Sequence, residues 1–63
     1  MKLSFKGKTA IVTGASGGMG LKTVDKLIQS RIRVLMLDIK EPPKQYIKNN
    51  KIEFKKIDLT NFS

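Results

Sequence analysis

A cluster of glycines is the feature of this sequence with the clearest chemical use. Gly14, Gly17, Gly18 and Gly20 stand between the apolar run 9–12 and a stretch with apolar residues at helical spacing. A glycine-rich turn at the start of a helix lets a phosphate approach backbone N–H donors, because no Cβ intervenes and the helix dipole favours anions. The cluster is therefore a candidate phosphate-binding loop in the setting of a dinucleotide-binding turn.

The spacing of the cluster separates it from two other phosphate-binding patterns. In the G-x-G-x-x-G pattern the last glycine would stand where this chain has Thr23. A Walker A loop needs Gly and Lys to be adjacent, but Leu21 separates Gly20 from Lys22. The sequence thus disfavours an NTPase loop.

An aspartate follows the second apolar run, which covers residues 34–37. Asp38 comes about 20 residues after the glycine loop, the spacing expected of an acid that accepts hydrogen bonds from both adenosine ribose hydroxyls. Charged hydrogen bonds of this kind contribute roughly 1.5–3 kcal/mol, whereas a 2′-phosphate would meet carboxylate repulsion. The alternative interpretation is that Asp38 is a solvated turn residue.

Five elements are predicted to position these residues. They are a buried strand over 9–12, an amphipathic helix over 19–30, a buried strand over 34–37, a short helix within 44–50 and a third strand over 52–57. Short connections and the right-handed crossover rule make the strands parallel. The sequence therefore predicts an α/β fold, the N-terminal βαβαβ half of a Rossmann, or doubly wound, parallel sheet.

The run T-G-A-S-G-G-M-G at residues 13–20 resembles the T-G-x-x-x-G-x-G signature of the short-chain dehydrogenases/reductases. Residues 7–14 look like that family's opening strand, and residues 37–38 and 57–60 look like the ends of its second and third strands. The resemblance covers the whole chain. It implies an oxidoreductase that transfers hydride between NAD(H) and an alcohol or ketone. The chain departs from the family at residues 31–32, Arg-Ile, where glycine and a small residue are usual.

The same resemblance implies further cofactor contacts. Asp58 would face the adenine amino group and Leu59 would pack near the ring, although Asp58 could instead, or also, cap a following helix. NADP-preferring relatives generally carry a basic residue at the positions of Gly17 or Ile39, so we predict NAD, with Lys40 the residue that could still reach a 2′-phosphate. The predicted cofactor-binding residues are Gly14, Ser16, Gly17, Gly18, Met19, Gly20, Asp38, Ile39, Asp58 and Leu59.

Catalytic residues are not predicted in this chain. The family uses Ser, Tyr and Lys with a Y-x-x-x-K motif, whereas Asn50 follows Tyr46, the one tyrosine, at that spacing. The sequence has no Cys and no His, so neither a familiar nucleophile–base pair nor a metal site is predicted. We interpret residues 1–63 as a partial dinucleotide-binding domain, truncated before the catalytic portion of a longer, homo-oligomeric enzyme.

The formal net charge of +8 raises the question of a nucleic-acid partner. The Lys and Arg residues are spread along the chain and the aromatic residues do not interleave with them, which favours a lysine-rich enzyme surface. No apolar run approaches the ~20 residues of a membrane span and no signal segment is recognised, so a cytoplasmic protein without membrane contact is predicted. Two alternatives stay open: a stand-alone nucleotide-binding module, and a small basic nucleic-acid-binding protein.

The stability of the isolated chain is expected to be marginal. In the usual strand order the first strand is central and pairs with a fourth strand, which this sequence lacks. We therefore expect an open sheet edge along residues 10–12. Broad or absent thermal unfolding, weak NAD binding at best and no dehydrogenase activity should follow.

Overall fold

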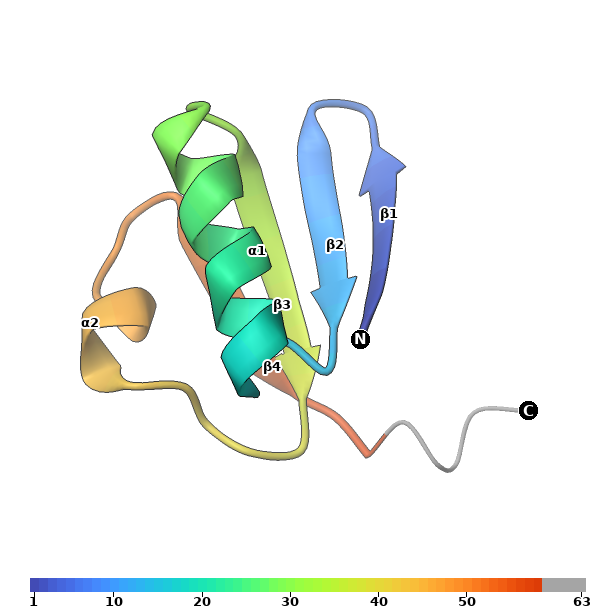
Figure 1. The fold of residues 1–63 in the computed structure, drawn as a ribbon, viewed down its shortest axis with the longest axis vertical. Coiled ribbons are helices and arrows are strands. Elements are labelled where there is room, and N and C mark those ends of the chain that lie inside the picture. Colours follow the sequence, from blue (N-terminus) through green and yellow to red (C-terminus); the bar gives the residue numbers. More distant parts are fainter. Residues whose placement is uncertain (59–63) are drawn as a thin grey trace.

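The structure, a computed structural model, describes residues 1–58 and contains one four-stranded sheet with two helices. Figure 1 shows the longer helix lying across one face of the sheet and the short helix beside it. The elements in chain order are β1 (Lys2–Lys6), β2 (Thr9–Thr13), α1 (Gly18–Gln29), β3 (Arg33–Asp38), α2 (Lys44–Ile47) and β4 (Ile52–Lys56).

The part of the chain from β2 to β4 has the predicted βαβαβ organisation. Thr9 pairs with Arg33 at the start of the parallel β2–β3 ladder, and Val34 pairs with Ile52 at the start of the parallel β3–β4 ladder. Helix α1 connects the first pair and the segment with α2 connects the second. The prediction of a half Rossmann sheet is confirmed.

The first strand, β1, was not predicted, and the expectation of an open edge along residues 10–12 is wrong for this chain. β1 pairs antiparallel with β2 along its whole length, with Leu3 opposite Val12. Gly7 and Lys8 form the two-residue turn, and Gly7 has φ 61°, as the first central residue of a type II′ hairpin requires. Every residue of β1 is exposed, so the strand covers an edge without joining the core.

The core lies between α1 and the face of the sheet beneath it. Alternate strand residues point to this face, and every third or fourth residue of α1 meets them. Burying an aliphatic side chain of this size contributes about 1.5–3 kcal/mol. The buried hydrophobic residues are Ala10, Val12, Ala15, Val24, Leu27, Val34, Met36 and Ile52.

The other face of the sheet carries the intervening residues. Ile11, Leu35 and Leu37 are only partly buried there, because α1 lies on the opposite side. Parallel sheets usually have both faces covered. The described part of the chain therefore builds one of the two layers that such a sheet needs.

Helix α1 ends in a hydrogen-bonded reversal that contains an unusual arginine. The N–H of Arg31 donates to the carbonyl of Ile28 at 2.9 Å and that of Ile32 to the carbonyl of Leu27 at 3.0 Å, which is a Schellman motif. Arg31 adopts φ 61°, a conformation that costs a residue with a Cβ about 1–2 kcal/mol. The helix thus ends where the family's glycine would stand, despite the arginine.

Within residues 1–58, neither helix is long and apolar enough to cross a membrane.

Candidate nucleotide-binding site

The glycine loop lies at the carboxyl end of the parallel strands, between β2 and α1 (Figure 1). The N–H of Gly14 donates to the carbonyl of Leu37 at 2.9 Å, which joins the loop to the end of β3. The N–H of Ile57 donates to the carbonyl of Asp38 at 3.0 Å, which brings the end of β4 alongside. Open α/β sheets bind their ligands at this end.

The first turn of α1 offers unused backbone donors. The helix starts at Gly18, and its N-cap residue, Gly17, has extended backbone angles and makes no side-chain capping bond. The carbonyl of Gly17 accepts from the N–H of Leu21 at 2.9 Å, so the intrahelical bonds begin there and the preceding N–H groups point out of the helix. The turn holds no acidic side chain, so these donors and the helix dipole suit an anion.

The glycines of the loop have two different roles. Gly14 needs to be glycine because of its own backbone, at φ 65°. A Cβ at Gly20 would come within 2.6 Å of the Gly14 carbonyl oxygen and 2.7 Å of the Cα of Ala15, so Gly20 lets α1 pack on the loop. By contrast, a Cβ at Gly17 or Gly18 would meet no atom within 4 Å. These two positions face open space, which leaves room for a bound phosphate.

The carboxylate of Asp38 is held toward the glycine loop by backbone donors. Its Oδ2 accepts from the N–H of Ser16 at 2.9 Å and its Oδ1 accepts from the N–H of Lys40 at 3.2 Å. An ionised carboxylate has about four lone-pair positions, so each oxygen keeps acceptor capacity for a further donor. The arrangement suits two neighbouring hydroxyl groups, such as those of a ribose.

The same contacts keep Asp38 ionised. Partial burial by itself would raise the pKa of this carboxyl. The N–H donors of Ser16, Lys40 and Ile39 and the positive charge of Lys40 outweigh burial, so the pKa of Asp38 lies below its ordinary value. A charged acceptor is therefore present at neutral pH.

Three other predicted site residues lie in the glycine loop, in the first turn of α1 and directly after β3. The hydroxyl of Ser16 donates to the carbonyl of Lys40 at 2.7 Å. Met19, in the first turn of α1, is 77% exposed, and Ile39, directly after Asp38, is 52% exposed. The backbone of Lys40 was missed as a part of the site, because peptide groups leave no signal in residue types.

Of the two residues expected at the adenine ring, Asp58 is within the described residues. Asp58 is exposed and lies two residues beyond β4, next to the Ile57 N–H that bonds to Asp38. Leu59 lies outside the described residues. Their role at the adenine stays a prediction.

Tyr46 is bound into the scaffold rather than set in the glycine-loop site. Its hydroxyl donates to the carboxylate of Asp25 on α1 at 2.8 Å. This hydrogen bond, with partial burial and the negative charge of Asp25, raises the pKa of Tyr46. The tyrosine therefore connects α2 to α1.

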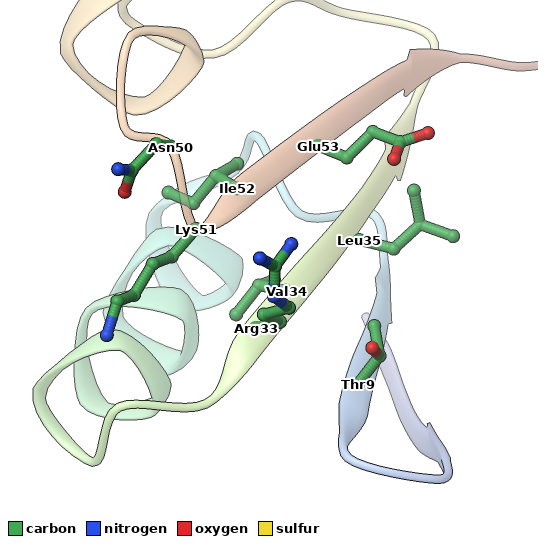
Figure 2. A pocket seen from close by; sticks show the side chains of 8 residues that line it. All are labelled: Thr9, Arg33, Val34, Leu35, Asn50, Lys51, Ile52 and Glu53. Atoms are coloured by element: carbon green, nitrogen blue, oxygen red, sulfur yellow. The ribbon is translucent and has the colours of Figure 1, made fainter.

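A cavity of about 320 Å³ lies at the opposite end of the sheet from the glycine loop. Figure 2 shows that it is lined by residues at or near the amino ends of β2, β3 and β4, with the cationic side chains of Arg33 and Lys51 among them. It shares no residue with the loop.

The described residues contain no group of three or more His, Cys, Asp or Glu side chains that could hold a metal ion.

Comparison with known proteins agrees with this geometry. The chain is 33% identical over 60 residues to the short-chain dehydrogenase/reductase ascJ of Acremonium egyptiacum, covering 95% of this chain and 20% of the relative. It is 43% identical over 42 residues to the short-chain dehydrogenase/reductase tropG of Talaromyces stipitatus, covering 67% of this chain and 13% of the relative. It is 36% identical over 50 residues to the dehydrogenase RED2 of Cochliobolus heterostrophus, covering 79% of this chain and 19% of the relative.

These relatives are several times longer than the chain, which spans 13–20% of their length. No solved structure gives a significant match. The sequence model of the family described as short chain dehydrogenase matches residues 8–63, nearly the whole sequence. The chain therefore belongs to the short-chain dehydrogenase family, a family of oxidoreductases.

Proposed function

We propose that this chain is the NAD-binding segment of a short-chain dehydrogenase/reductase. The observation that carries the proposal is the pairing of two groups at one end of the sheet. An uncapped helix N-terminus with open space at Gly17 and Gly18 lies beside the oriented carboxylate of Asp38. Pyrophosphate needs the first and a ribose diol needs the second, and a dinucleotide carries both.

Different residues would bind different parts of the cofactor. The N–H groups of the first turn of α1 would bind the pyrophosphate, and the lack of side chains at Gly17 and Gly18 admits it. Asp38 would accept hydrogen bonds from the adenosine ribose. Asp58 and Leu59 would contact the adenine. The nicotinamide, when bound, supplies the hydride chemistry, and this chain's residues bind and orient the rest of the cofactor.

The preference for NAD over NADP rests on Asp38. Its ionised carboxylate would put a negative charge where NADP carries the 2′-phosphate. Repulsion there disfavours NADP, and the neutral residues Gly17 and Ile39 supply no compensating charge. Lys40 is the neighbouring cation that works against this preference.

For the whole protein, we propose hydride transfer between NAD(H) and an alcohol or ketone by a cytoplasmic homo-oligomer. The family and the dehydrogenase relatives support this activity. The Ser, Tyr and Lys that such chemistry uses are not combined in this chain, and so the 63 residues supply cofactor binding only. We expect the chain alone to have no dehydrogenase activity.

The test is an NMR titration of the 63-residue chain with NAD⁺, with Gly18→Val as the site variant. We expect the amide signals of residues 14–20 and 38–40 to shift in the wild type and to stay unchanged in the variant, because a β-branched side chain blocks the phosphate. The variant should keep its fold, since the space at Gly18 is open. Equal NAD⁺ affinity in the two proteins, or shifts confined to other residues, would contradict the assignment.

A further inference from the structure

Three hydrogen bonds organise the contact between the glycine loop and the turn after β3, two between the segments and one within the turn. Ser16 supplies two of them, from its N–H to Oδ2 of Asp38 at 2.9 Å and from its hydroxyl to the carbonyl of Lys40 at 2.7 Å. The third runs from the N–H of Lys40 back to Oδ1 of Asp38 at 3.2 Å. The three residues thus form a closed ring, which we call the Ser16 ring, between segments separated by more than 20 positions in sequence.

We propose that Ser16 is a positioning residue for cofactor selection, whose hydroxyl closes this ring and holds the Asp38 carboxylate and the Lys40 turn in the arrangement that prefers an unphosphorylated ribose. The proposal rests on the proposed function. It adds a role for the Ser16 side chain that does not require it to touch the cofactor.

The hydroxyl fixes the Asp38 carboxylate indirectly. With the ring closed, each carboxylate oxygen accepts from a backbone N–H, so the carboxylate cannot rotate without breaking a bond. Its remaining lone pairs then keep a constant direction. Pre-orientation of this kind improves binding because the cofactor does not have to order the acceptor.

The ring also restrains the cation next to it. Lys40 is exposed, and its positive charge acts on the Asp38 carboxylate that would accept from the ribose. Because the hydroxyl of Ser16 donates to the Lys40 carbonyl, this hydrogen bond restrains the turn that carries the lysine side chain. Loss of the hydroxyl releases the turn, and a released Lys40 can approach a 2′-phosphate.

The experiment compares the full 63-residue chain with Ser16→Ala, Ser16→Thr and Ser30→Ala. Alanine keeps the N–H and removes the hydroxyl, threonine keeps both, and Ser30 is an exposed serine at the far end of α1. The probes are ADP-ribose and its 2′-phosphorylated form, and their affinities are measured by NMR titration. A second readout without nucleotide is the pKa of the Asp38 carboxyl.

In Ser16→Ala we expect the affinity ratio of ADP-ribose to its 2′-phosphate form to fall about fivefold, the effect of one ordinary hydrogen bond. The pKa of Asp38 should rise toward its ordinary value, because the Lys40 N–H is no longer held against Oδ1. Ser16→Thr should restore both readouts, and Ser30→Ala should change neither. A general loss of packing would weaken the binding of both probes equally and leave their affinity ratio unchanged.

Each result decides between distinct conclusions. If the wild type prefers ADP-ribose but Ser16→Ala leaves both the ratio and the pKa of Asp38 unchanged, the Ser16 proposal is wrong and the NAD-binding assignment stands. Failure of threonine to restore the ratio has the same meaning. If neither probe shifts the signals of residues 14–20 and 38–40 in the wild type even at millimolar concentration, the NAD-binding assignment for this chain is wrong. An ordinary pKa for Asp38 in the wild type overturns the ring itself.

Discussion

The two ends of the parallel sheet present their polar groups in different ways. At the carboxyl end, an aspartate is fixed by two backbone donors and faces a helix N-terminus with unused N–H groups. At the amino end, the turns carry exposed cations such as Lys8, Arg31 and Lys51. Of the cationic residues there, Arg33 and Lys51 line the cavity (Figure 2). The polar groups of the carboxyl end have the more definite arrangement, because hydrogen bonds hold them.

The comparison shows why charge alone is a poor guide to the site in this protein. The amino end contributes strongly to the +8 net charge, but exposed side chains such as those of Lys51 and Arg33 keep their rotamer freedom and their hydration. A binding group is useful when its orientation is already fixed. At the carboxyl end, hydrogen bonds between distant segments supply that orientation.

The sharpest test of the carboxyl end compares two neighbouring glycines. Gly20→Ala should destabilise the fold by about 1–3 kcal/mol, since the new Cβ overpacks against the Gly14 carbonyl and Ala15. Gly18→Ala should be neutral or slightly stabilising, because its Cβ enters open space at the start of a helix. Urea unfolding of both variants measures the difference. Equal losses would mean that α1 does not pack on the loop as described.

Cofactor choice should change when the fixed acceptor is replaced by a cation. Asp38→Ala combined with Ile39→Arg removes the ribose acceptor and adds a partner for a 2′-phosphate. The ratio of NAD to NADP affinity should fall about tenfold for each 1.4 kcal/mol of changed discrimination. The matched control is Arg33→Ala at the amino end, which should leave the ratio unchanged. An unmoved ratio in the double variant would remove Asp38 from the ribose site.

At the amino end, the arginine that follows α1 should limit stability without affecting binding. Arg31→Gly is expected to stabilise the chain by about 1 kcal/mol, because glycine adopts the positive φ of this position readily. Thermal unfolding followed by circular dichroism measures the change, with Arg33→Gly as a control whose strand position offers no such gain. Altered NAD⁺ affinity in Arg31→Gly would show that the two ends are coupled.

The smallest expected effect is the pH dependence that Asp38 gives to the stability of the chain and to its NAD⁺ affinity. Since its pKa is lower in the folded chain than in the unfolded chain, its hydrogen bonds contribute stability above the unfolded pKa, and this contribution is lost as pH falls through the folded value. NAD⁺ affinity should fall over the same acidic range, because protonation removes the charged acceptor. Asp38→Asn should flatten both profiles, and unchanged profiles would argue against an ionised, hydrogen-bonded Asp38.

The N-terminal strand has a hairpin pattern in its sequence. Lys2 to Lys6 alternates polar and apolar residues, and Gly7-Lys8 is a favourable two-residue hairpin turn. What the pattern cannot tell is which edge the strand joins. In the structure β1 takes the edge of β2, which removes one reason for expecting a poorly stable chain, while Leu3 and Phe5 stay exposed on it.

The sequence by itself determined the local features of this protein. Apolar alternation and helical spacing depend on neighbours within a few positions, so they identified β2 to β4, α1 and the glycine loop. Tertiary structure decided which residues meet across the chain. Ser16 reaches Asp38 and Lys40, and a Cβ would meet neighbouring atoms at Gly20 but open space at Gly18. Those outcomes depend on distances between remote segments, and residue types and spacing do not contain such distances.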